Sequence, residues 1–124
     1  MIRVCKPEGR VLVADVALNP EHSAAYDKLE IIRDPTHTHA LTTEEFYKLF
    51  QTDSLQNCTQ TSYEIDIELE SQIRASFPAE GDEKTLRDMI TNDIGVNRLG
   101  INARRSGDEI IYTVPIGVYM GYKL

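Results

Sequence analysis

The feature that most constrains this chain is an apolar run near its start, at residues 10–16 (RVLVADV). Pro7 and Gly9 mark a tight turn before it. The apolar side chains do not alternate with polar ones, which is typical of a strand buried on both faces inside an α/β sheet. Asp15 interrupts the run near its carboxyl end, where open α/β sheets bind ligands. The run therefore predicts a central strand, with Asp15 either facing a ligand or capping the next loop.

Apolar spacing and capping signals predict the remaining elements. Helical periodicity favours helices over residues 20–33, 42–50 and 82–94, with a short helical turn over 70–77. Asp34-Pro35 ends the first of these helices, Thr42 and Glu45 can form a capping box at the second, and Asp82 is the expected cap of the third. Alternating residues predict strands over 59–69, 109–114 and 116–122, with a bulge or a change of partner at Pro115 and Gly117. We expect one α/β domain over residues 1–124. Its small mixed sheet has one buried strand plus antiparallel strands, and about three helices pack against it.

Composition excludes several classes of function. The net charge of −7 argues against binding nucleic acid or anionic lipid. No apolar run approaches the length of a membrane span, and no signal peptide is recognisable at the start. The two cysteines lie far apart and form no CxxC pair, which favours free thiols in a reducing compartment. We therefore expect a cytoplasmic protein that binds neither nucleic acid nor membranes.

Three segments resemble one enzyme family. RVCKPEGRVLVADV resembles the helix end, turn and fifth strand of class I S-adenosylmethionine-dependent methyltransferases. LEIIRDPTHTHALTTEEFYKLF is similar to a block of the small-molecule methyltransferases of ubiquinone and menaquinone biosynthesis, and DEIIYTVPIGVYMGYKL resembles their last strand. The resemblance implies that the chain is the carboxyl-terminal half of a Rossmann-like methyltransferase fold.

The resemblance also implies what is missing. The cofactor-binding half of this family carries a glycine-rich loop after its first strand, and nothing in this chain matches it. The glycines at residues 95–100 (GVNRLG) follow a predicted helix, so they are no substitute. S-adenosylmethionine is therefore the cofactor of the full-length family, and we expect this chain alone to bind none. The full enzyme would methylate a small molecule, and this fragment would supply part of its substrate pocket.

The candidate site residues follow from the same resemblance. His37 is the candidate catalytic residue, because a histidine in the segment over the substrate could act as a general base. Asp15, Arg33, Asp34 and His39 are candidate substrate-binding residues. The alternative for the loop is structural, with an Arg33–Asp34 pair and a proline holding it between two helices. We expect no metal site, since no third histidine or cysteine is placed to join His37 and His39.

A rival hypothesis needs no catalysis. In the family's topology the fifth strand lies between the fourth and the seventh, and the fourth has no counterpart in this chain. The strand at residues 10–16 would then present an apolar, unpaired edge, and such edges pair with other chains. The chain could therefore be a non-catalytic α/β module that forms a homodimer through this edge.

Overall fold

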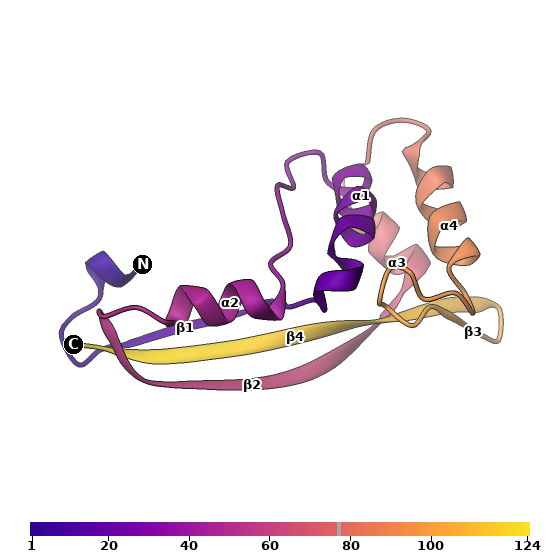
Figure 1. Cartoon of the computed structure of the whole chain (residues 1–124). Coiled ribbons are helices and arrows are strands. Elements are labelled where there is room, and N and C mark those ends of the chain that lie inside the picture. Colours follow the sequence, from indigo (N-terminus) through magenta and orange to yellow (C-terminus); the bar gives the residue numbers. More distant parts are fainter. Residues whose placement is uncertain (77) are drawn as a thin grey trace.

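The computed structural model describes residues 1–76 and 78–124, and within them the chain forms four strands, four α-helices and two 3-10 helices (Figure 1). The strands are β1 (Arg10–Val16), β2 (Leu55–Glu68), β3 (Arg104–Ser106) and β4 (Glu109–Lys123). The helices are η1 (Ile2–Val4), η2 (Pro20–His22), α1 (Ser23–Arg33), α2 (Thr43–Phe50), α3 (Leu69–Arg74) and α4 (Asp82–Asn92). The short helical turn expected over residues 70–77 is α3, and residue 77 lies outside the described residues. No described helix has the length and apolarity needed to cross a bilayer.

The sheet is antiparallel throughout. Its order is β1-β4-β2, with β3 also paired to β4. The prediction of a mixed sheet is therefore wrong: β1 and β2 run in the same direction, but β4 separates them. β4 also runs unbroken through Pro115. This proline lies between the part of β4 that pairs with β3 and the part that pairs with β1, so its missing N–H interrupts neither ladder.

Two hydrophobic clusters cover different parts of the sheet. The larger one lies between α1, α3, α4 and one end of the sheet, and its sheet residues include Tyr112 and Val114. The smaller one lies under α2, at the other end of the sheet (Figure 1). There Phe46 stacks on Tyr119 with ring centroids 4.7 Å apart. Because side chains alternate along a strand, Tyr112 and Tyr119 project from opposite faces of β4. Each face of the sheet is therefore covered over only part of its length.

This partial cover corrects one prediction. β1 was expected to be buried on both faces, but Leu12 is 53% exposed and Ala14 is also exposed, whereas Val11 is buried. No described helix lies over the face of β1 that carries Leu12. Tyr63 and Ile65, on β2, are exposed for the same reason. The apolar composition of β1 thus exceeds what the described part of the chain covers.

Local sequence signals place the helices that flank the site. Thr42 and Glu45 form the expected capping box at the start of α2. Asn19 accepts a hydrogen bond from the backbone of Glu21 at the start of η2, and α1 follows directly. At α4 the N-cap residue is Gly81 rather than the expected Asp82. The capping box fixes one end of the loop at residues 34–41, which joins α1 to α2, and at the other end Asp34 donates its backbone N–H to the Glu30 carbonyl at 2.8 Å.

Candidate functional site

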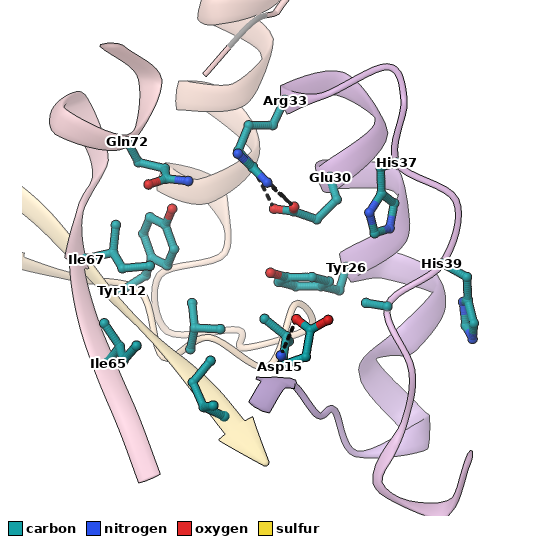
Figure 2. A pocket seen from close by; sticks show the side chains of 14 residues that line it. Asp15, Tyr26, Glu30, Arg33, His37, His39, Ile65, Ile67, Gln72 and Tyr112 are labelled. Atoms are coloured by element: carbon teal, nitrogen blue, oxygen red, sulfur yellow. Dashed lines mark hydrogen bonds and ion pairs between the residues drawn. The ribbon is translucent and has the colours of Figure 1, made fainter. Parts of the chain in front are cut away.

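A cavity of about 330 Å³ lies between α1, the loop at residues 34–41 and the sheet (Figure 2). Apolar side chains of β2 and β4 line it, among them Ile65, Ile67, Val114 and Ile116. Polar side chains complete the lining: Asp15, Tyr26, Glu30, Arg33, His37, His39, Gln72 and Tyr112. Four of the five predicted site residues therefore border one cavity, and Asp34 is the exception.

Two tyrosines give the cavity neutral hydrogen-bonding groups. Tyr26 comes from α1 and Tyr112 from β4, and burial raises the pKa of both phenols. Figure 2 shows both rings beside the open space of the cavity. Among the described residues, no hydrogen bond is made by either hydroxyl, and neither oxygen is fully enclosed. Both phenols stay protonated at physiological pH and can donate a hydrogen bond to an oxygen of a bound molecule.

An ion pair forms the upper wall of the cavity as drawn in Figure 2. Arg33 donates to the carboxylate of Glu30 from Nε at 3.0 and 3.1 Å and from Nη2 at 2.6 Å. The hydrogen bonds that Arg33 donates to Glu30 raise the pKa of Arg33. Glu30 is only 9% exposed, so its negative charge depends on this partner. Arg33 therefore pairs with Glu30 one helical turn away, and not with the adjacent Asp34.

Asp27 of α1 holds the loop at residues 34–41 in place. Its Oδ1 lies 2.9 Å from Nε2 of His37 and accepts the Ala40 N–H at 2.8 Å, while its Oδ2 lies 2.6 Å from Nδ1 of His39. Burial acts to raise the pKa of Asp27, but hydrogen bonds from Ala40, His37 and His39 outweigh it and lower the pKa. An ionised carboxylate can only accept, so His37 must donate from Nε2. Neutral His37 then keeps a lone pair on Nδ1, as a general base requires.

His39 has a different state. Its Nδ1 contacts Asp27 at 2.6 Å, and its Nε2 contacts Oε1 of Glu45 at 2.8 Å. The hydrogen bonds that His39 donates to Glu45 and, with a smaller effect, to Asp27 raise the pKa of His39. With both ring nitrogens facing carboxylates, His39 is an imidazolium that ties the loop to α1 and α2. It has no free nitrogen for a substrate, although it borders the cavity.

The state of His39 predicts a pH dependence. Because its folded pKa is raised above the unfolded value of about 6.5, its stabilising contribution is complete below that pH and is lost as the pH rises through the folded pKa. We expect the stability difference between the native chain and His39→Gln to shrink from about pH 6 to about pH 9, measured by urea unfolding. A difference that stays constant over this range would contradict the ion pairs. The lowered pKa values of Asp27 and Glu45 act only in acid, so they leave this window unaffected.

Two predicted residues have mainly local contacts. Asp34 accepts hydrogen bonds from the backbone and the hydroxyl of Thr36, and these hydrogen bonds lower its pKa. It stabilises the turn after α1 and does not line the cavity. Asp15 accepts the backbone N–H of Val16 at 2.7 Å and also borders the cavity beside Tyr26. Asp15 thus caps the end of β1 and remains available to the cavity.

Sequence reasoning missed most of the inner lining. Tyr26, Glu30 and Arg33 recur at the spacing of one helix face, so this spacing was a usable signal. Tyr112 and Gln72 carried no local signal, because the fold brings them from distant strands and helices. No group of three or more His, Cys, Asp or Glu side chains within residues 1–76 and 78–124 is placed to hold a metal ion.

Comparison with solved structures identifies the fold. The YcgJ protein of Bacillus subtilis superposes with a TM-score of 0.82 over 98% of this chain, at 20% sequence identity. A candidate methyltransferase of Bacillus halodurans superposes with the same TM-score and coverage, at 14% identity. No family model and no curated protein sequence matches the chain. The chain therefore has the α/β fold of a candidate methyltransferase over nearly its whole length.

The chain is shorter than both of these proteins. It spans 54% of the YcgJ protein and 59% of the candidate methyltransferase. Each solved structure therefore contains a large segment that has no counterpart in this chain.

Proposed function

We propose that this chain is the substrate-binding part of a methyltransferase that acts on a small molecule with S-adenosylmethionine as methyl donor. The observation that carries the proposal is the cavity, which gathers Asp15, Arg33, His37 and His39 around two protonated phenols. The fold shared with a candidate methyltransferase supports it. So does the size of the cavity, which is at the lower end of the range for small-molecule sites.

The lining suggests how a methyl acceptor would be held. The apolar side chains of Ile67 and Val114 would contact the body of the molecule, and the hydroxyls of Tyr26 and Tyr112 would orient an oxygen. His37, with Nε2 held by Asp27, would take the proton that the acceptor atom loses during methyl transfer. Positioning of this kind supplies much of the rate enhancement when one reactant is already activated.

The described residues do not fit the cofactor itself. No strand of the described structure is followed by a glycine-rich turn and a helix; β1, for example, continues as Ala17, Leu18 and Asn19. Backbone N–H groups of such a turn are what this class of fold uses to approach a cofactor closely. Our proposal therefore assigns S-adenosylmethionine to a segment outside this chain, and we derive no step through it.

The proposal can be tested by blocking the cavity. We expect phenol and catechol to shift the amide NMR signals of Tyr26, Ile67 and Tyr112, and S-adenosylmethionine to shift none. Ile65→Trp places an indole in the cavity and should weaken probe binding about tenfold or more, by filling space that the probe needs. Tyr63→Trp is the matched control, because it lies on the same face of β2 but does not line the cavity.

Two outcomes would count against the proposal. If the probes shift signals elsewhere, or bind Ile65→Trp as well as the native chain, the cavity is not the binding site. If the chain alone binds S-adenosylmethionine with micromolar affinity, the assignment of substrate binding to this chain and of cofactor binding to another segment is wrong.

A second candidate function is a non-catalytic module that assembles through β1. One observation favours it: in the described structure β1 pairs with β4 on one side only. This candidate predicts assembly of the chain whether or not the cavity binds a ligand.

A further inference from the structure

Both cationic side chains on the wall of the cavity already contact carboxylates. Arg33 directs Nε and Nη2 to Glu30, and its remaining nitrogen, Nη1, donates to Oγ of Ser76 at 3.4 Å. His39 has a carboxylate oxygen at 2.6 Å from one ring nitrogen and another at 2.8 Å from the other. A carboxylate or a phosphate that entered the cavity would therefore meet no unpaired cation among the described residues that line it.

Carboxylates outnumber cations around the same space. Among the described residues, two carboxylates line the cavity and two more hold its histidines from behind: Asp15, Glu30, Asp27 and Glu45. Arg33 and His39 supply only two positive charges against these four. The surroundings of the cavity thus carry an excess of negative charge, which repels an anionic ligand and attracts a cationic one.

Asp15 is the carboxylate of this set that has no cationic partner among the described residues. Its Oδ1 accepts the backbone N–H of Val16 at 2.7 Å, and its Oδ2 makes no hydrogen bond with them. Figure 2 shows this carboxylate beside the ring of Tyr26, at the lower end of the cavity as drawn. Oδ2 can therefore accept a hydrogen bond from a cationic group of a ligand without breaking any contact of the chain.

The two tyrosines point to a ligand independently of the charges. Tyr26 is 5% exposed and Tyr112 is 6% exposed, and neither hydroxyl has a hydrogen-bond partner among the described residues. The large majority of buried polar groups in native proteins are hydrogen-bonded, so we expect a bound molecule to supply the missing partners. A ligand that completes this lining carries a neutral polar group for the hydroxyls and a positive charge for Asp15.

We propose that the cavity takes a small aromatic molecule with one positive charge, such as an arylalkylamine in its ammonium form, and that Asp15 selects this charge. The inference rests on the proposed function, because it names the chemical class of the acceptor that the same cavity would hold. Ile65 and Ile67 contact the ring of this molecule. The phenol hydroxyls orient its neutral polar group, and Asp15 pairs with its ammonium group.

Three probes that share a phenol ring and differ in charge test this inference. Tyramine is a cation, para-ethylphenol is neutral and para-hydroxyphenylacetate is an anion. We expect NMR titration, followed at the amides of Tyr26, Ile67 and Tyr112, to give tyramine a dissociation constant about fivefold below that of para-ethylphenol, as an ion pair with an exposed carboxylate allows. Para-hydroxyphenylacetate should bind more weakly than para-ethylphenol.

Asp15→Asn tests the role of Asp15 itself. Asparagine keeps an oxygen that can accept the Val16 N–H, so the substitution removes the charge and retains the local contact. It should remove most of the advantage of tyramine over para-ethylphenol. Asp53→Asn is the matched control, because it takes the same charge from the exposed turn before β2 and does not line the cavity. This control should retain the preference for tyramine, and circular dichroism verifies that both variants fold.

The outcomes separate this inference from the proposed function. Equal binding of tyramine and para-ethylphenol, or tighter binding of para-hydroxyphenylacetate, overturns the inference and leaves the proposed function standing, because the neutral probe still occupies the cavity. A preference for tyramine that survives Asp15→Asn, or that Asp53→Asn removes equally, also overturns it, since Asp15 is then not the selecting group. If none of the probes shifts the signals of the cavity residues, the proposed function fails and this inference fails with it.

Discussion

Replacing Arg33 with leucine is expected to lower the free energy of unfolding by about 3 kcal/mol. Leucine and arginine have similar helix propensities, so the change in α1 itself is small. The loss arises because the carboxylate of Glu30, 9% exposed, is left without the three short contacts that Arg33 supplies. Urea unfolding followed by circular dichroism measures the change, and the upper wall of the cavity should loosen with it.

Two companion variants separate charge burial from loss of packing. Glu30→Leu with Arg33→Leu should recover much of the stability, because no unpaired charge remains buried. Arg87→Leu removes a comparable pair with Glu70, but both side chains are more than a third exposed, so this substitution should change the stability much less than Arg33→Leu does. If Arg33→Leu costs no more than Arg87→Leu, the pair contributes nothing beyond an exposed surface pair.

The second large effect is expected at α2. Phe46→Ala should lower the free energy of unfolding by about 3–4 kcal/mol, because it removes a buried ring that stacks on Tyr119. Phe46 is the buried residue of this eight-residue helix, and so short a helix depends on tertiary contacts. Amide hydrogen exchange should show the loss, first in α2 and then in the loop that Glu45 holds through His39.

Tyr47→Ala is the control for this substitution. Tyr47 is the next aromatic residue of α2 and is exposed, so its loss should change stability by no more than about 0.5 kcal/mol. Equal effects at the two positions would mean that α2 does not dock through Phe46.

Local patterns predicted most of the helices and strands, but not which of their faces other segments would cover. The Thr42–Glu45 capping box, the stop at Asp34-Pro35 and the alternation of residues 63–69 each depend on neighbours in sequence, and the helices and strands they predict are present. The cover on β1 depends on other segments. The run of apolar residues indicates a strand that suits burial on both faces, and the described chain buries Val11 while it leaves Leu12 exposed.

The site was predictable where it is local. His37 and His39 lie in one loop, and the structure places both on the same wall of the cavity. Asp27, whose carboxylate contacts both histidines, lies on α1, 10 and 12 residues before them in sequence, and belongs to no motif. Asp34 was included because it is part of the RDPTH motif, but its contacts are with Thr36 in the same turn. Tyr112 lies at the cavity because β4 pairs with β2, which places it opposite Ile67, and the sequence alone does not indicate this pairing.

The division of the buried hydrophobic residues into two clusters affects how cooperatively the chain unfolds. The cluster beneath α2 and the cluster beneath α1, α3 and α4 have no residue in common, and they lie on opposite faces of β4. Cooperativity between them passes through the backbone ladder of β4, the short segment from Ala17 to Leu18, and His39, which contacts Asp27 of α1 and Glu45 of α2, since the clusters share no apolar side chain. The chain is thus built from two unequal folding units on one strand. The smaller unit is the one expected to open first.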